Sequence, residues 1–179
     1  MAIAQMMLPE FDKEMDNTRR VLERVPDDQW NWKPHEKSGT VGWLASHIAN
    51  MAGWMAATIN TDQFDVAPPD GPAYEPPKID NRKDLLAEFE KNVGEARAAL
   101  VGASDERLLK DWSLLGGGKP IFTMPRAACI RGMVMNHIIH HRAQLLVYFR
   151  LLRVPVPGLY GPSADEAQFA AGSSAAAGN

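Results

Sequence analysis

Three histidines have the spacing and surroundings of metal ligands. His137 and His141 stand four positions apart in one apolar stretch, and His47 stands in a second apolar stretch. Four residues are about one turn of an α-helix, so the side chains of His137 and His141 project from the same helix face. A third imidazole from a neighbouring helix would complete a set of three nitrogen ligands and leave coordination positions open. Open positions are typical of a catalytic metal rather than a structural one.

His140 leaves the choice of the ligand pair open on spacing alone. It follows His137 by three residues, so pairs at i, i+3 and at i, i+4 both fit one helix face. The apolar positions Met133 and Leu145 lie in line with His141 and favour it as the inward residue. The histidines could also form a buried polar network without a metal, because imidazoles on apolar helices need hydrogen-bond partners.

Side chains around the histidines are predicted to support the metal site. A ligating imidazole needs a hydrogen-bond partner on its second nitrogen, and five side chains are candidates that the sequence does not separate: Asn50, Asn136, Gln144, Glu14 and Asp16. Trp43, four residues before His47, is predicted to line a pocket beside the metal. Arg142 is interpreted as one half of a salt bridge on the helix surface rather than as a group that orients an anionic substrate.

Four helices are predicted to position these residues. Apolar residues recur at intervals of three and four over 8–25, 40–60, 81–102 and 125–153. The expected N-caps are Ser38 or Thr40 for the second helix, Asp80 or Asn81 for the third, and Thr123, with Pro125 in the first turn, for the fourth.

The connections predict how the helices are joined. Segment 63–79 holds five prolines, so we expect an extended crossover and no strand, long enough for the second and third helices to run parallel. A short capped helix is expected at 104–108, and a small hairpin or loop at 114–123. The predicted fold class is all-α, a four-helix bundle with a long Pro-rich crossover between helices 2 and 3.

Composition limits the classes of protein. The 179 residues are 45% hydrophobic, which predicts one domain over 1–166 and a low-complexity, disordered tail over 167–179. The net charge is −3 with dispersed positive charges, so no nucleic-acid partner is expected. We expect no signal peptide, and no window reaches the roughly 18 apolar residues of a membrane span. The single cysteine, Cys129, excludes an internal disulfide and favours a cytoplasmic location.

Three blocks of sequence together resemble the DinB-like (YfiT-like) superfamily of metalloenzymes. They are TVGWLASHIA at 40–49, NHIIHHRAQL at 136–145 and VPVPGLYGPSADE at 154–166. The resemblance covers most of residues 5–166. One departure is Ala143, where many relatives have glycine, and it does not affect the histidines.

The resemblance implies a fold, a metal and a class of activity. It implies a four-helix bundle that binds a divalent metal, often nickel or zinc, through His47, His137 and His141, and that often forms a homodimer. Characterised members include transferases and isomerases that use low-molecular-weight thiols such as mycothiol or bacillithiol. We therefore expect a metal-dependent transferase that joins a thiol to a small-molecule substrate. The alternatives are a metal-dependent hydrolase that activates water and a non-enzymatic, stress-linked metal-binding protein.

Overall fold

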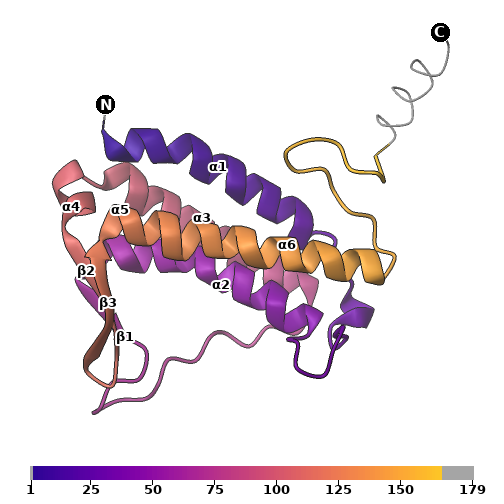
Figure 1. The fold of residues 1–179 in the computed structure, drawn as a ribbon, viewed down its shortest axis with the longest axis horizontal. Coiled ribbons are helices and arrows are strands. Elements are labelled where there is room, and N and C mark those ends of the chain that lie inside the picture. Colours follow the sequence, from indigo (N-terminus) through magenta and orange to yellow (C-terminus); the bar gives the residue numbers. More distant parts are fainter. Residues whose placement is uncertain (1, 167–179) are drawn as a thin grey trace, which may run out of the picture.

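The computed structural model describes residues 2–166, which are mostly helical (Figure 1). Four long helices make up most of the molecule: α1 (Ile3–Leu22), α2 (Val41–Asn60), α3 (Arg82–Gly102) and α6 (Asn136–Leu151). Figure 1 shows α2 and α3 running in one direction, and α1 and α6 running in the other. The Pro-rich crossover returns the chain along the molecule, so the parallel course expected of the second and third helices is confirmed. The tail predicted over 167–179 lies outside the described residues.

The helix starts follow local capping chemistry. The Thr40 side chain accepts a hydrogen bond from the Trp43 backbone N–H, and the Asn81 side chain accepts one from the Asp84 backbone N–H. Both N-caps are therefore among those predicted. The first helix begins at Ile3 rather than at residue 8, so Pro9 lies inside it. Within residues 2–166, no helix combines the length and the apolar character needed to cross a membrane.

The structure also contains a small mixed sheet, so the all-α prediction is only partly correct. Its strand order is β1 (Gln63–Asp65), β2 (Asp111–Gly116) and β3 (Lys119–Pro125), with β1 parallel and β3 antiparallel to β2. The expectation of no strand in 63–79 is wrong for 63–65, because the prolines begin only at Pro68 and the preceding residues are free to pair. The predicted hairpin is present, and Gly117 and Gly118 turn it with positive φ angles of 63° and 75°.

Short helical segments connect these elements. They are η1 (Asp27–Gln29), α4 (Asp105–Leu109) and α5 (Arg126–Cys129). Segment α4 is the predicted capped helix, with the Ser104 side chain accepting from the Arg107 backbone N–H. The predicted N-cap Thr123 is wrong, because this residue lies in β3, where its hydroxyl is 2.7 Å from that of Ser113.

The helix predicted over 125–153 is interrupted by a π-helical segment, η2 (Ile130–Met135), which lies between α5 and α6. A π-helical turn holds an extra residue relative to an α-helix and is frequent beside functional sites. Cys129, just before η2, is buried. His137 follows η2 by two residues. The π-helical turn therefore sets the orientation of α6, which carries His137 and His141, relative to the sheet.

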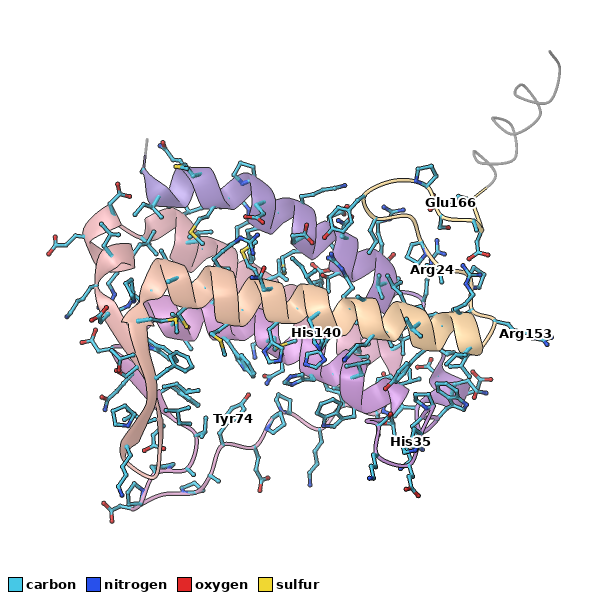
Figure 2. The ribbon with its side chains drawn as sticks, in the orientation of Figure 1. Arg24, His35, Tyr74, His140, Arg153 and Glu166 are labelled. Carbon is cyan, nitrogen blue, oxygen red and sulfur yellow. The ribbon has the colours of Figure 1, made fainter. Side chains whose placement is uncertain are left out.

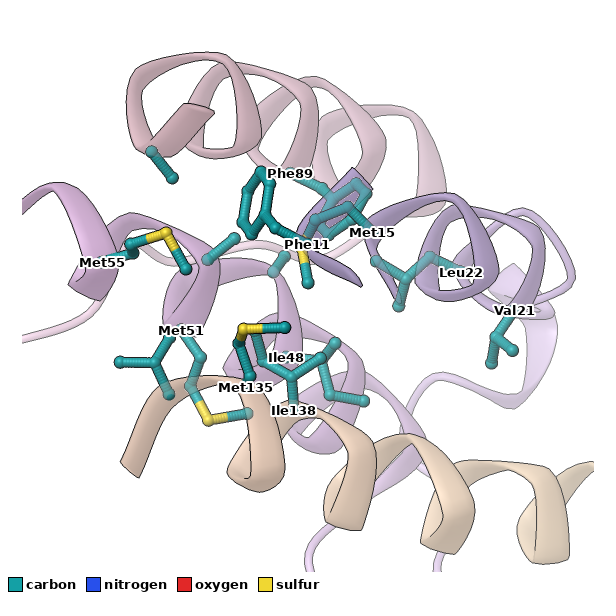
Figure 3. Close-up of a cluster of buried hydrophobic side chains, with 14 of the residues drawn as sticks. Phe11, Met15, Val21, Leu22, Ile48, Met51, Met55, Phe89, Met135 and Ile138 are labelled. Atoms are coloured by element: carbon teal, nitrogen blue, oxygen red, sulfur yellow. The ribbon is translucent and has the colours of Figure 1, made fainter. Parts of the chain in front are cut away.

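The hydrophobic core fills the space between the four long helices (Figure 3). Phe11 and Met15 come from α1, Ile48 and Met51 from α2, and Phe89 from α3, and all are almost fully buried. The helix α6 contributes Ile138 on the face that meets them. Because His137 precedes Ile138 by one residue, the histidine points to the border of this core rather than into its centre.

Arg142 is buried, which corrects the prediction of a surface salt bridge. Its guanidinium donates to Glu14 Oε2 at 2.6 Å and to Thr18 Oγ1 at 3.1 Å on α1. Tyr160, in the segment after α6, donates to the same carboxylate at 2.8 Å. Both Arg142 and Glu14 are less than 10% exposed. The arginine therefore joins α6, α1 and the C-terminal segment.

Candidate metal centre

The three predicted histidines come together where α2 and α6 face each other. One ligand atom from each of His47, His137 and His141 lies within 4.8 Å of the other two. The Nε2 atoms of His137 and His141 are 2.9 Å apart. Within residues 2–166 this is the only cluster of three or more potential metal-ligating side chains. His140 is exposed and lies outside the cluster, so the i, i+4 alternative is the one that the fold favours.

Gln144 fixes the orientation of His141. Its Oε1 lies 2.7 Å from His141 Nδ1, and its Nε2 lies 3.1 Å from His140 Nε2. A carboxamide oxygen only accepts hydrogen bonds, so His141 Nδ1 carries the proton and donates it. Neutral His141 therefore directs the Nε2 lone pair toward His137. Of the five partners proposed for the second nitrogen, Gln144 is the one in place.

His137 meets His141 nitrogen to nitrogen. Its Nδ1 is buried and makes no hydrogen bond of good geometry within the described residues. If His137 carries its proton on Nε2, that proton bridges the two rings. If it carries the proton on Nδ1, two lone pairs face each other across 2.9 Å, an arrangement that only a shared cation makes favourable.

Burial favours the neutral, metal-binding form of His47 and His137. Desolvation, followed by the nearby His141 and His137, lowers the pKa of His47 from 6.5 to about 4. The pKa of His137 is also lowered, mainly by desolvation and then by His141, although the Met133 carbonyl acts in the opposite direction. A protonated imidazole has no free lone pair for an ion, so the lowered pKa values favour the ligand state at neutral pH.

Two of the nitrogen positions are close enough to share one metal ion. Bonds of about 2.0–2.1 Å are usual between zinc and imidazole nitrogen, so two ligand nitrogens lie about 2.9 Å apart at a right angle and about 3.3 Å apart at the tetrahedral angle. The His137 and His141 Nε2 atoms, 2.9 Å apart, lie at the short end of this range. The cluster contains no fourth side chain within the described residues, which leaves room for a substrate or water on an ion bound there.

Two tryptophans enclose the cluster. The ring of Trp43 stacks on His47, with centroids 5.1 Å apart and planes 16° apart. Trp54 packs edge-on against His47 at 5.6 Å and lies 5.9 Å from His137. The role of Trp43 beside the cluster was predicted, but that of Trp54 was missed. Its spacing was a usable signal, because seven residues after His47 is about two helical turns.

Two cavities reach the histidines. One, of about 450 Å³, is lined in part by His137, and the other, of about 600 Å³, is lined in part by His47. The sequence did not predict Tyr74 or Ser46, which line the first and the second cavity respectively. Tyr74 extends from the crossover toward the helices (Figure 2) and donates to Asn50 Oδ1 at 2.8 Å. A lone aromatic residue among prolines was the only sequence signal for it.

Comparisons with known proteins agree with the resemblance seen in the sequence. A family model described as the DinB superfamily matches residues 10–145. YrdA, an uncharacterized protein of Bacillus subtilis (strain 168), is 26% identical over 165 residues, which are 89% of each chain.

Two crystal structures have the same fold. The DinB-like protein YjoA of Bacillus subtilis is 20% identical with a TM-score of 0.66, and the match covers 88% of this chain and 99% of that one. A DinB-like protein of Bacillus cereus is 22% identical with a TM-score of 0.68, and the match covers 86% and 95%. At these identities the likeness establishes the fold alone.

Proposed function

The chain belongs to the DinB superfamily, and from this membership and its histidine cluster we propose that it is a metal-dependent enzyme. His47, His137 and His141 would hold one divalent ion, nickel or zinc. The observation that carries the proposal is the convergence of three imidazoles from two helices, with two Nε2 atoms 2.9 Å apart and facing each other. Facing lone pairs at that distance are unfavourable unless a cation or proton lies between them.

The surrounding residues prepare the site for an ion. An ion held by three neutral nitrogens lowers the pKa of a thiol or water that binds to it. Gln144 holds His141 in the tautomer that presents Nε2. Trp43 and Trp54 pack against the ring of His47, which restricts its movement before an ion binds.

The nucleophile that we propose is a low-molecular-weight thiol, which would be transferred to a small-molecule substrate. Within the described residues no carboxylate belongs to the histidine cluster. Activated water commonly works with a neighbouring general base, whereas a thiol becomes a competent nucleophile once it has lost its proton. This difference supports the transferase over the hydrolase, which would use the same metal.

Exposed apolar side chains support a homodimer as part of the same proposal. Trp43 on α2 is 55% exposed, and Val147 and Leu151 on α6 are each 58% exposed. Association of two copies would remove these side chains from water. Sedimentation of the full chain should detect a dimer, and a clean monomer at high protein concentration would contradict it.

Metal binding is the decisive test. Untagged protein should retain or take up about one nickel or zinc ion per chain, measured by plasma mass spectrometry and by titration calorimetry. His47→Ala, His137→Ala and His141→Ala should each abolish tight binding. The matched control is His140→Ala, on the same helix but outside the cluster, which should retain it. Failure of the wild type to bind either ion after reconstitution would overturn the proposal.

Activity then separates the candidates. Metal-loaded protein should consume thiol in the presence of a small electrophile, and the His137→Ala variant should not. Turnover of esters or amides without added thiol would favour the hydrolase. A tightly bound metal with neither activity would favour the non-enzymatic, stress-linked metal-binding protein.

A further inference from the structure

The cavity beside His137 is almost entirely apolar. We call it the apolar cavity; its wall includes aromatic rings from α2 and all three strands, namely Trp54, Phe64, Trp112 and Phe122. Met133 and Val134 of η2 close it next to His137. Its volume of about 450 Å³ lies within the range of pockets that bind small molecules.

The wall of the apolar cavity contains a negatively charged residue but no positively charged lysine or arginine. No lysine or arginine lines it, and Glu95 is the one carboxylate in its wall. In the metal-free protein, a carboxylate, sulfonate or phosphate placed there would lose hydration and find no cation in return, which is costly. An uncharged molecule meets no such penalty and would bury its surface against aromatic rings.

A hydrogen-bonding position is built into the wall of the apolar cavity. Asn50 is buried, and its Oδ1 accepts the hydrogen bond of Tyr74. The hydrogen bond formed by the Asn50 side chain within residues 2–166 is the one that its Oδ1 accepts from Tyr74. Its Nδ2 is therefore available to a ligand, and a ligand that offers one carbonyl, nitro or ether oxygen would gain a hydrogen bond here.

The second cavity has the opposite character. Ser46 and His47 line it on α2, and Glu75, Lys78 and Asp80 of the crossover line it from the other side. Ser46 Oγ is buried and has no hydrogen-bond partner within the described residues. This polar cavity suits a molecule with several charged or hydrogen-bonding groups.

We propose that the apolar cavity binds an uncharged, mainly apolar small molecule, about one to three aromatic rings in size, with its reactive end at His137. The second reactant, which is hydrophilic, would then bind in the polar cavity beside His47. Reaction of the ligand at the end next to His137 depends on the proposed metal-dependent function, whereas its binding in the apolar cavity does not. The two claims can therefore fail separately.

A matched pair of dyes tests the charge preference in the chelator-treated, metal-free protein. Phenylnaphthylamine is uncharged, and anilinonaphthalene sulfonate has the same rings with one added anion. Energy transfer from tryptophan emission, with Trp54 and Trp112 in the wall, should report binding of both. We expect the uncharged dye to bind at least tenfold more tightly. Equal or tighter binding of the sulfonate, or no binding of the uncharged dye up to its solubility limit, would overturn the proposal.

Two substitutions locate the bound dye. Ala57 lines the apolar cavity, so Ala57→Phe should lower the affinity for phenylnaphthylamine at least tenfold. Ala98→Phe, the same change at an exposed position of α3, should leave it unchanged. Glu95→Gln, at an exposed wall residue and with little risk to folding, should reduce the preference over the sulfonate. If Ala57→Phe left the affinity for phenylnaphthylamine unchanged and Glu95→Gln left the preference over the sulfonate unchanged, the dye would bind elsewhere and the assignment would be rejected.

A paramagnetic ion separates this inference from the proposed function. In protein loaded with Co²⁺, proton resonances of bound phenylnaphthylamine should broaden, because the cavity reaches His137. Bound cobalt without broadening would reject the placement of the ligand beside the histidines and leave the metal site intact. If no metal binds but the dye binds with the expected preference, the metal-dependent function fails and the apolar binding site stands.

Discussion

Gln144 Oε1 lies 2.7 Å from Nδ1 of His141, three residues earlier on the same helix. This contact sets the tautomer of the histidine, so Gln144→Ala should weaken metal binding about 10–100-fold without removing a ligand. Gln144→Glu keeps an acceptor at the same position and should retain most of the affinity. Calorimetric titration with zinc measures both variants. Equal affinity of Gln144→Ala and wild type would show that the ring needs no such support.

Falling pH should destabilise the metal-free protein through His47. Desolvation and then the neighbouring histidines lower its pKa in the folded state from 6.5 to about 4. Between these values the unfolded chain binds a proton that the folded protein does not, so the free energy of unfolding decreases as pH falls. The lowered pKa of His137 acts with the same sign.

Urea unfolding of chelator-treated protein at pH values from about 7 to about 4 checks this dependence on pH. His47→Phe should flatten the curve, because the buried imidazole is gone. His35→Ala, at an exposed position, should leave the slope as it is. If the wild-type protein were equally stable across this pH range, burial would not be lowering the pKa values of His47 and His137.

Removing Arg142 should strongly destabilise the fold. Its partner Glu14 is 6% exposed, and Arg142→Ala would leave this carboxylate buried without its cation, at a cost of about 3–5 kcal/mol. Replacing both residues, Glu14→Leu with Arg142→Met, should recover most of the loss. Arg97→Ala breaks an exposed pair with Asp12 and should change the unfolding free energy little. Denaturant unfolding compares the variants, and a small loss in Arg142→Ala would contradict the buried pair.

Two glycines in helices should respond oppositely to alanine. A Cβ at Gly42, in the first turn of α2, would overlap the indole of Trp30, whereas one at Gly94 in α3 meets no atom within 4 Å. Gly42→Ala should cost about 1–3 kcal/mol or more through overpacking. Gly94→Ala should stabilise the protein by up to about 1 kcal/mol through helix propensity. Thermal unfolding distinguishes the two, and a neutral Gly42→Ala would mean that Trp30 moves freely.

The parts of the fold that depend on local patterns could be predicted. The four long helices and the caps at Thr40, Asn81 and Ser104 follow from periodicity and from short polar side chains at helix starts. Strand β1 was missed because its partner lies about fifty residues later, and nothing within 63–65 specifies that pairing. The π-helical turn was also missed, since an extra residue leaves the apolar composition of the helix unchanged.

The histidine cluster was predictable because helical spacing brings His137 and His141 together and an apolar setting suggested His47 as the third. Its surroundings depend on contacts between distant segments. Arg142 is buried because Glu14, 128 residues earlier, faces it, and no nearby residue indicates that pairing. Tyr74 reaches the site only because the crossover lies over α2.

The π-helical segment makes the site sensitive to the length of the chain. Loss of a single residue from 130–135 would let the helix continue in regular α form. Each residue of an α-helix corresponds to about 100° of rotation and 1.5 Å of advance, so the part of the helix that holds His137 and His141 would turn relative to α5 and the hairpin. Either Arg126 of α5 would lose its hydrogen bond to the Thr58 carbonyl of α2, or the two imidazoles would turn away from His47. A one-residue deletion here should therefore be far more damaging than the loss of one side chain, and related chains that keep the site should keep the residue count.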